Sequence, residues 1–154
     1  MTHLAYYQTE IGTIGIAATE EAITHVLFPG SQPPEGAVKG ETPLIKRAIE
    51  QLEEYLNGKR KSFDLPLSFS GTPFQEMVWN ALLTIPYGET RTYSEIAHQI
   101  GRHKAFRAVG MANNKNPLSI FIPCHRVIGT GGKMVGYGGG VHIKEHLLKL
   151  EGAI

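Results

Sequence analysis

The chain has 154 residues, of which 42% are hydrophobic and 19% are charged, and it carries a formal net charge of +1. A chain of this length can bury a core in one domain or in two small ones. It contains no apolar run of about 18 residues and no charged-then-apolar N-terminal leader, and its single cysteine excludes an internal disulfide. We therefore expect a cytoplasmic globular protein with no membrane span.

Charge is divided unevenly along the chain. Residues 1–70 carry six Lys or Arg and nine Asp or Glu, which gives −3, whereas residues 71–154 carry nine and five, which gives +4. The Ser-Gly-Thr stretch at residues 70–72 is typical of a boundary between folded parts. We expect two domains, 1–70 and 71–154, and the mildly basic second one favours a polyanionic partner.

The first domain has the pattern of a scaffold. Residues 3–8, 12–18 and 22–28 predict short strands of an antiparallel meander. Apolar residues recur at helical spacing over 43–55, which predicts a helix. Residues 63–69 are compatible with one more strand. No residue pattern in this domain indicates chemistry.

The second domain is predicted to be mainly helical. A Thr-Pro-Phe-Gln capping box at residues 72–75 predicts a helix that ends before Pro86. A second capping box, Thr-Tyr-Ser-Glu, opens a short helix over 93–100. Apolar spacing predicts the last helix over 141–150.

The stretch after the second capping box has the helix-turn-helix pattern. The helix over 93–100 is followed by a short turn and a further predicted helix over 104–113. The second helix carries small residues that let its backbone approach another molecule closely, at positions Ala105, Ala108, Gly110 and Ala112. Arg107 projects from it. The same pattern is common in proteins that bind no nucleic acid.

The only cysteine lies in the most informative segment, residues 116–127. The apolar run Ile120–Ile122 predicts a buried strand that delivers Pro123, Cys124 and His125 to its end. A thiol beside an imidazole suggests an activated nucleophile. The alternative is that Cys124 is a small buried hydrophobic residue.

A glycine-rich segment follows this motif. Seven of residues 129–140 are glycine, without the order of a phosphate loop or a dinucleotide fingerprint. Glycines leave space and free backbone amides, which suits a wall around a flat ligand.

These motifs resemble those of a known family. The resemblance rests on Pro-Cys-His-Arg-Val at 123–127, Arg-Ala-Val-Gly at 107–110, Asn-Pro at 116–117, Tyr137, and Leu-Glu-Gly at 150–152. From about Thr72 to Gly152 the chain resembles the O6-alkylguanine-DNA alkyltransferases, also called methylated-DNA–protein-cysteine methyltransferases. The first 70 residues match only in general style. The resemblance implies an α/β (α+β) fold, with a small N-terminal antiparallel-sheet domain (ribonuclease H-like) and a C-terminal helical helix-turn-helix domain (winged-helix-like).

The same resemblance implies a reaction. It is DNA repair by irreversible transfer of the alkyl group of O6-alkylguanine, and of O4-alkylthymine, to Cys124, once per molecule. The thiol needs a base, and the adjacent His125 is the obvious one. The resemblance implies that Glu151 orients His125 and that Asn116 hydrogen-bonds near this network. A carboxylate beside a helix C-terminus is not favoured by the helix dipole, which supports a role for Glu151; the alternative is a solvated helix-end glutamate. We expect no cofactor and a monomer.

The resemblance also implies how substrate is bound. Double-stranded DNA would be held through its minor groove, with the alkylated base flipped out. The expected DNA-contacting residues are Arg107, which would fill the gap left by the base, Tyr93, which would push on the backbone and bond the purine, and Ser94, Ala105 and Thr130. Tyr137, Gly138, Val127 and Asn113 are expected to line the pocket. Tyr137 would pack on the base, the Gly138 amide would face O6, and the Cys124 and Val127 carbonyls would accept from the guanine amine.

Two alternatives remain from the sequence, a damage-binding protein without chemistry and a cysteine hydrolase. Some members of the family hold a structural zinc with Cys and His in the first half, but this chain has no cysteine there. His142 and His146 stand one helical turn apart without an evident third ligand. We expect surface histidines and no metal site.

Overall fold

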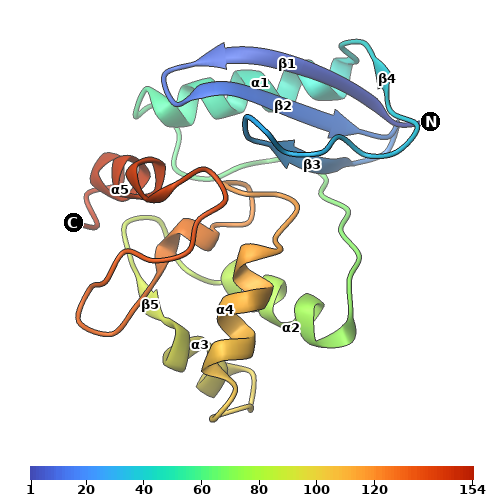
Figure 1. Ribbon diagram of the computed structural model, residues 1–154. Helices are drawn as coiled ribbons and strands as arrows, with labels where there is room; N and C mark the ends of the chain where they lie inside the picture. The colour runs from blue at the N-terminus through green and yellow to red at the C-terminus, as the bar shows by residue number, and fades with distance from the viewer. The chain divides into compact units, whose positions relative to one another are not determined.

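The computed structural model describes all of residues 1–154, which form two compact units, Met1–Phe69 and Ser70–Ile154 (Figure 1). No helix in either unit is long and apolar enough to cross a membrane.

The N-terminal unit is a four-stranded sheet with one helix. Its strands are β1 (His3–Thr9), β2 (Gly12–Ala18), β3 (Ile23–Leu27) and β4 (Val38–Lys39), in the order β3-β2-β1-β4. β1 and β3 pair antiparallel with β2, and β4 pairs parallel with β1. The helix α1 (Pro43–Leu56) packs on β1, β2 and β3. The predicted meander and helix are confirmed.

Thr42 explains where α1 begins. Its hydroxyl accepts from the Ile45 amide at 3.2 Å, and Pro43 occupies the first helical position, where no backbone donor is needed. The buried face of α1, with Ile45 and Leu52 fully buried, covers the equally buried Ile14 and Ile16 of β2. This apolar contact is the core of the unit.

The further strand considered for residues 63–69 is not present. Only an isolated bridge joins Leu67 to Ile23, through hydrogen bonds from Ile23 N to Pro66 O and from Ser68 N to Ile23 O. Pro66 has no amide hydrogen, so the ladder cannot continue there. The two-residue strand β4 was not predicted because it is too short to show alternation.

The C-terminal unit packs helices around the segment that holds Cys124. In order its elements are α2 (Pro73–Leu82), β5 (Arg91–Thr92), α3 (Tyr93–Gln99), α4 (Phe106–Asn114), the 3-10 turn η1 (Cys124–Arg126), β6 (Val127–Ile128) and α5 (Val141–Leu150). α2, α3 and α4 pack on one another, and β5 pairs parallel with β6. Both predicted capping boxes are present, at the starts of α2 and α3. The prediction for 104–113 was early by two residues, because Ala105 is the N-cap of α4.

The prediction of a strand at 120–122 is wrong. All three residues are buried, but the segment is a tight turn in which Ile120 has φ 78° and Ile122 N donates to Leu118 O at 2.8 Å. The Asn116 side chain pairs two backbone groups of this turn. Its Oδ1 accepts from Leu118 N and its Nδ2 donates to Ile122 O, each at 2.9 Å. A side chain that bonds nearby backbone groups in this way replaces a strand neighbour.

Candidate active site

Cys124 is held at the start of η1, directly after the turn. It is 3% exposed, and its thiol donates to the Ser119 hydroxyl at 3.8 Å. Burial raises the pKa of the Cys124 thiol above its ordinary value, and hydrogen bonding with Asn116 and Ser119 and the charge of Lys144 offset this only in part. The resting thiol is therefore protonated at neutral pH and needs a base before it can attack.

His125, the residue predicted to act as that base, is paired with Glu151. Its Nε2 lies 2.8 Å from Glu151 Oε2, and both side chains are fully buried. Burial lowers the pKa of His125, against the opposing effect of Glu151, so the ring is neutral at neutral pH. A neutral imidazole that donates through Nε2 has an accepting Nδ1, which is the form that can take up a proton. The alternative of a solvated Glu151 is wrong.

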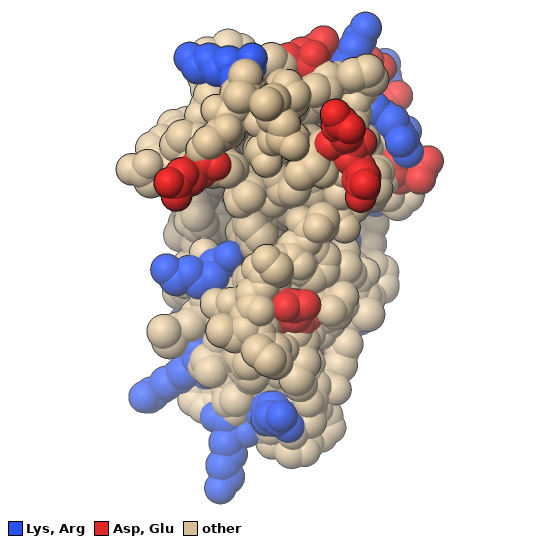
Figure 2. Space-filling model, turned by 90° about the vertical axis from the view of Figure 1, so that its right-hand side faces the viewer, with Lys and Arg blue, Asp and Glu red and all other residues tan.

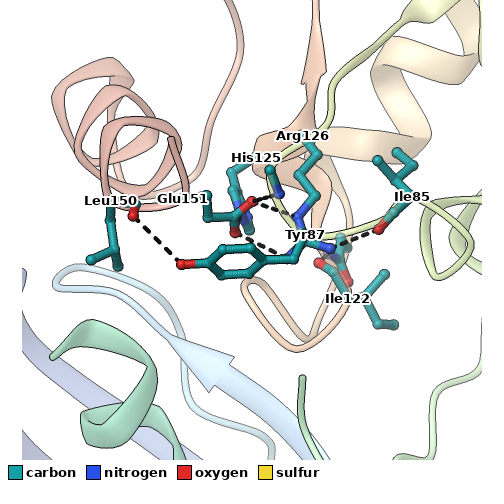
Figure 3. Close-up of polar contacts among 9 residues, drawn as sticks. Ile85, Tyr87, Ile122, His125, Arg126, Leu150 and Glu151 are labelled. Atoms are coloured by element: carbon teal, nitrogen blue, oxygen red, sulfur yellow. Dashed lines mark hydrogen bonds and ion pairs between the residues drawn. The ribbon is translucent and has the colours of Figure 1, made fainter. Parts of the chain in front are cut away.

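Arg126 completes the network around Glu151 (Figure 3). Its Nε and Nη2 donate to the two carboxylate oxygens at 2.9 and 3.0 Å, and Nη1 donates to Ile85 O at 2.7 Å. The Gly88 amide also donates to Glu151, at 3.1 Å. The carboxylate is thus fixed from three sides, and its charge is balanced by the guanidinium. The sequence analysis quoted Arg126 within the motif but gave it no role.

Lys144 is a second buried cation that the sequence analysis missed. It is 0% exposed, and its Nζ donates to Val127 O and, at 2.9 Å, to Val135 O. The Tyr93 hydroxyl donates to the same Val135 oxygen at 3.1 Å. Burial lowers the pKa of Lys144 to about 8, although the Cys124 thiolate would raise it. A lysine beside Ile143 on an amphipathic helix gives no sequence signal of burial.

The residues expected to line the pocket differ in their degree of burial. Asn113 is buried, and its Nδ2 donates to Cys124 O at 3.4 Å, while its buried Oδ1 has no hydrogen-bond partner. Val127 is buried, Tyr137 is half-buried and Gly138 is exposed. Two members of the set, Asn113 and Val127, are thus buried, and Gly138 is open to solvent.

The residues expected to contact DNA lie at the starts of helices and in the glycine-rich segment. Tyr93 and Ser94 open α3, with Tyr93 half-buried and Ser94 exposed. Ala105 caps α4, and Arg107 is exposed on its first turn with its guanidinium 5.8 Å from the Phe106 ring centre. Thr130 is exposed. Of this set, Tyr93 is the one joined to the network of Cys124, through the Val135 oxygen that it shares with Lys144.

No group of three or more His, Cys, Asp or Glu in residues 1–154 is arranged to hold a metal ion. His142 and His146 are exposed on α5.

Comparison with known protein families covers nearly the whole chain. Residues 2–69 match the model of the 6-O-methylguanine DNA methyltransferase, ribonuclease-like domain, and residues 73–153 match that of the 6-O-methylguanine DNA methyltransferase, DNA binding domain. The chain belongs to the 6-O-methylguanine DNA methyltransferase family. The resemblance found in the sequence is thereby confirmed, and it extends over the first 70 residues as well.

Individual members of the 6-O-methylguanine DNA methyltransferase family are similar over nearly their full lengths. A methylated-DNA–protein-cysteine methyltransferase of Methanosarcina acetivorans is 51% identical over 155 residues, 98% of this chain and 99% of the relative. The constitutive one of Bacillus subtilis is 44% identical over 98% of this chain and 96% of the relative. The crystal structure of Mycobacterium tuberculosis OGT in complex with DNA matches with a TM-score of 0.92 and 44% identity, over 98% of this chain and 93% of that one. The predicted fold class, a small sheet unit followed by a helical unit, is confirmed.

Proposed function

We propose that this protein repairs DNA by moving the alkyl group of O6-alkylguanine onto Cys124, once per molecule. The observation that carries the proposal is the buried thiol of Cys124 followed by a neutral His125 that Glu151 holds at 2.8 Å. Membership of the methyltransferase family and similarity to a relative solved with DNA support the substrate class.

The steps follow from the protonation states. His125 takes the thiol proton, and the thiolate sulfur forms a bond to the alkyl carbon while the bond from that carbon to O6 breaks. The bonding electrons stay on the guanine, which regains its keto form by taking a proton at N1 from the imidazolium. Thiol and O6-alkylguanine thus become thioether and guanine. A thioether has no leaving group that water displaces readily, so the protein is consumed.

The DNA would be bound through the minor groove, with the damaged nucleotide flipped out. A flipped base is required because the reacting carbon is inaccessible within a stacked duplex. The exposed Arg107 would fill the gap, Tyr93 would push on the backbone, and Ser94, Ala105 and Thr130 would contact the strand. Support comes from the net charge of +4 on residues 71–154, and most of the charged side chains that Figure 2 shows on that unit are Lys or Arg.

The flipped base would sit between the glycine-rich segment and η1. Tyr137 would pack on the ring, the Gly138 amide would donate to O6, and the carbonyls of Cys124 and Val127 would accept from the amine. The orphan Oδ1 of Asn113 is a further acceptor in this region. O4-alkylthymine offers a similar alkyl-oxygen group and is included as a substrate. In this proposal residues 1–70 serve as a scaffold, residues 71–154 carry the chemistry, and the protein acts as a cytoplasmic monomer.

The test is the mass of the protein after reaction. Incubation with excess duplex containing O6-methylguanine should add one methyl group, and peptide mapping should place it on Cys124. More than one methyl removed per protein molecule would falsify the proposal. Binding of the damaged duplex without a mass gain would indicate a damage-binding protein, and turnover of esters or peptides would indicate a cysteine hydrolase.

A further inference from the structure

Lys144 is a buried charge that the transfer steps above do not use. Its two hydrogen-bond acceptors, Val127 O and Val135 O, are neutral carbonyls. Its ammonium also lies 5.9 Å from the centre of the Tyr93 ring, within the range of a cation–π contact. None of these groups carries a negative charge. An ammonium is costly to bury without a counter-charge, so its place in the core requires a cause.

The charges of the neighbouring network do not balance Lys144. Arg126 and Glu151 cancel each other through two short contacts, and His125 is neutral. While Cys124 is a thiol, Lys144 therefore leaves one uncompensated positive charge. Ionisation of Cys124 supplies one negative charge. The helix that carries Lys144, α5, packs on η1, which begins at Cys124, and the Lys144 ammonium donates to the carbonyl of Val127 directly after η1. In this position Lys144 lowers the pKa of Cys124, and the thiolate raises the pKa of Lys144.

We propose that Lys144 is a positioning residue of the transfer reaction, whose buried ammonium is the counter-charge of the Cys124 thiolate and whose hydrogen bonds tie the glycine-rich segment 129–140 to β6. The inference rests on the proposed function, in which the thiolate is the attacking species. The thiol proton goes to His125, and Lys144 keeps its protons throughout. After transfer the thioether carries no charge, and Lys144 is again uncompensated.

Other ionisable groups stand on the elements around this pair. They are Tyr93 on α3, His125 and Arg126 on η1, Lys133 in the glycine-rich segment, Arg91 on β5, and His142, Glu145, His146, Lys149 and Glu151 on or beside α5. Lys133, His142, His146 and Lys149 are exposed, so solvent screens their charges. The buried charges, Arg126 and Glu151, balance each other.

The single cysteine makes a direct titration feasible. The 13Cβ chemical shift of Cys124 would be followed against pH in the parent protein and in Lys144→Met, which keeps the length of the side chain and removes its charge. Lys144→Arg keeps a charge at the same position. Lys149→Met is the matched control, because it removes an exposed lysine of the same helix.

Loss of the counter-charge should raise the ionisation midpoint of Cys124 by about one pH unit or more, the size typical of a nearby opposite charge. The thiolate fraction at pH 7 then falls roughly tenfold for each unit, and alkylation by free O6-benzylguanine slows in parallel but recovers at high pH. Lys144→Arg should restore most of the midpoint and Lys149→Met should leave it unchanged. A midpoint in Lys144→Met equal to that of the parent protein overturns the proposal, whatever the rate.

A second measurement needs no substitution at Lys144. In the parent protein with 15N-labelled lysine, Cys124 is capped with methyl methanethiosulfonate, and the Lys144 ammonium is titrated before and after. Capping should lower the Lys144 midpoint, and an unchanged midpoint counts against the inference. Neither titration uses DNA. Failure of the Lys144 role is thus distinguishable from failure of the repair function, which the mass measurement on duplex DNA tests separately.

Discussion

The two units bury polar side chains very differently. In the N-terminal unit the buried polar residue is Gln51, whose amide group bonds the backbone of Asp64 at 2.9 and 3.1 Å. The C-terminal unit buries seven polar or charged residues, namely Asn113, Asn116, Ser119, His125, Arg126, Lys144 and Glu151. The second unit is stabilised less by apolar burial alone and depends also on the hydrogen bonds and ion pairs that these groups make.

This difference agrees with the proposal that the second unit carries the chemistry. Burying polar groups costs free energy unless every group is paired, so a fold optimised for stability alone avoids it. All seven residues lie on or next to the segments around Cys124 and Glu151. The N-terminal unit, with its apolar core, is the expected structure of a scaffold. Four predictions test this contrast.

The largest effect is expected from Cys124→Ala. Transfer should be abolished, because no second cysteine exists in the chain. Binding to duplex DNA, measured by gel shift, should stay within about twofold, since the removed sulfur is buried and small. Residual transfer would mean that a different nucleophile acts. It would contradict the proposal that the buried polar groups of the second unit surround the reacting residue.

Breaking the Glu151–Arg126 ion pair should lower the free energy of unfolding more than breaking the hydrogen bonds of Gln51 in the first unit. Glu151→Gln leaves the Arg126 guanidinium buried and uncompensated, which typically costs about 3–5 kcal/mol. Gln51→Leu leaves only backbone groups of the exposed Asp64, which water reaches, so we expect about 1 kcal/mol. Urea unfolding followed by circular dichroism measures both. Equal losses would show that the two units do not differ in this respect.

Arg107→Ala should affect duplex repair selectively. Unstacking a base costs a few kcal/mol and is required only in a duplex, so repair there should slow by about 10- to 100-fold, roughly 1.4–2.7 kcal/mol. Reaction with free O6-benzylguanine should be nearly unchanged, because Arg107 is exposed on α4 outside the buried network. Lys104→Ala, an exposed cation just before α4, is the control. Equal losses on both substrates would remove Arg107 from base flipping.

The smallest expected effect is destabilisation by the product. A methyl group on the closely packed Cys124 should cost about 1–3 kcal/mol, or several degrees in melting temperature, and a benzyl group should cost more. Thermal melts of the free and alkylated protein measure this, with Cys124→Ala treated identically as the control. An adduct that melts at or above the free protein would show that the site has room to spare.

The size of this effect should depend on pH. Because burial raises the pKa of Cys124, the folded free protein holds a proton that the unfolded chain loses at high pH, so the free protein loses stability as pH rises through about 9. The adduct has no such proton. The difference in melting temperature between the free and the alkylated protein should therefore become smaller between about pH 7 and pH 9.5. A difference that grows over this range would contradict the raised pKa of Cys124.

Local rules predicted much of the fold. Alternation and helical spacing located β1 to β3, α1 and α5, and the capping boxes located the starts of α2 and α3, because each of these signals lies within a few neighbouring residues. The turn at residues 118–122 was mistaken for a strand because a run of apolar residues indicates that a segment is buried but does not indicate whether its backbone is extended or turned. Its shape depends on Asn116, whose side chain takes the place of a neighbouring strand.

The site was predicted only where a motif marks it. Cys124 and His125 were named because a thiol beside an imidazole suggests an activated nucleophile, and Glu151 was named from the family resemblance. The contact between His125 and Glu151 is present in the structure. The contact of Arg126 with Glu151 spans 25 positions, which no local pattern reports. Lys144 was missed because charged residues on an amphipathic helix are read as exposed. Both omissions are buried cations, whose partners become visible only in three dimensions.

The hydrogen bond from Cys124 to Ser119 has a consequence for how long the protein remains competent. Peroxides and stray electrophiles in a cell consume cysteines that are exposed and ionised. Cys124 is 3% exposed, and its thiol is protonated at neutral pH and donates a hydrogen bond to the Ser119 hydroxyl. In a protein that reacts once, oxidation of the thiol inactivates the molecule before it can repair a base. The burial that slows the chemistry therefore also preserves each molecule, unreacted, until a damaged base arrives.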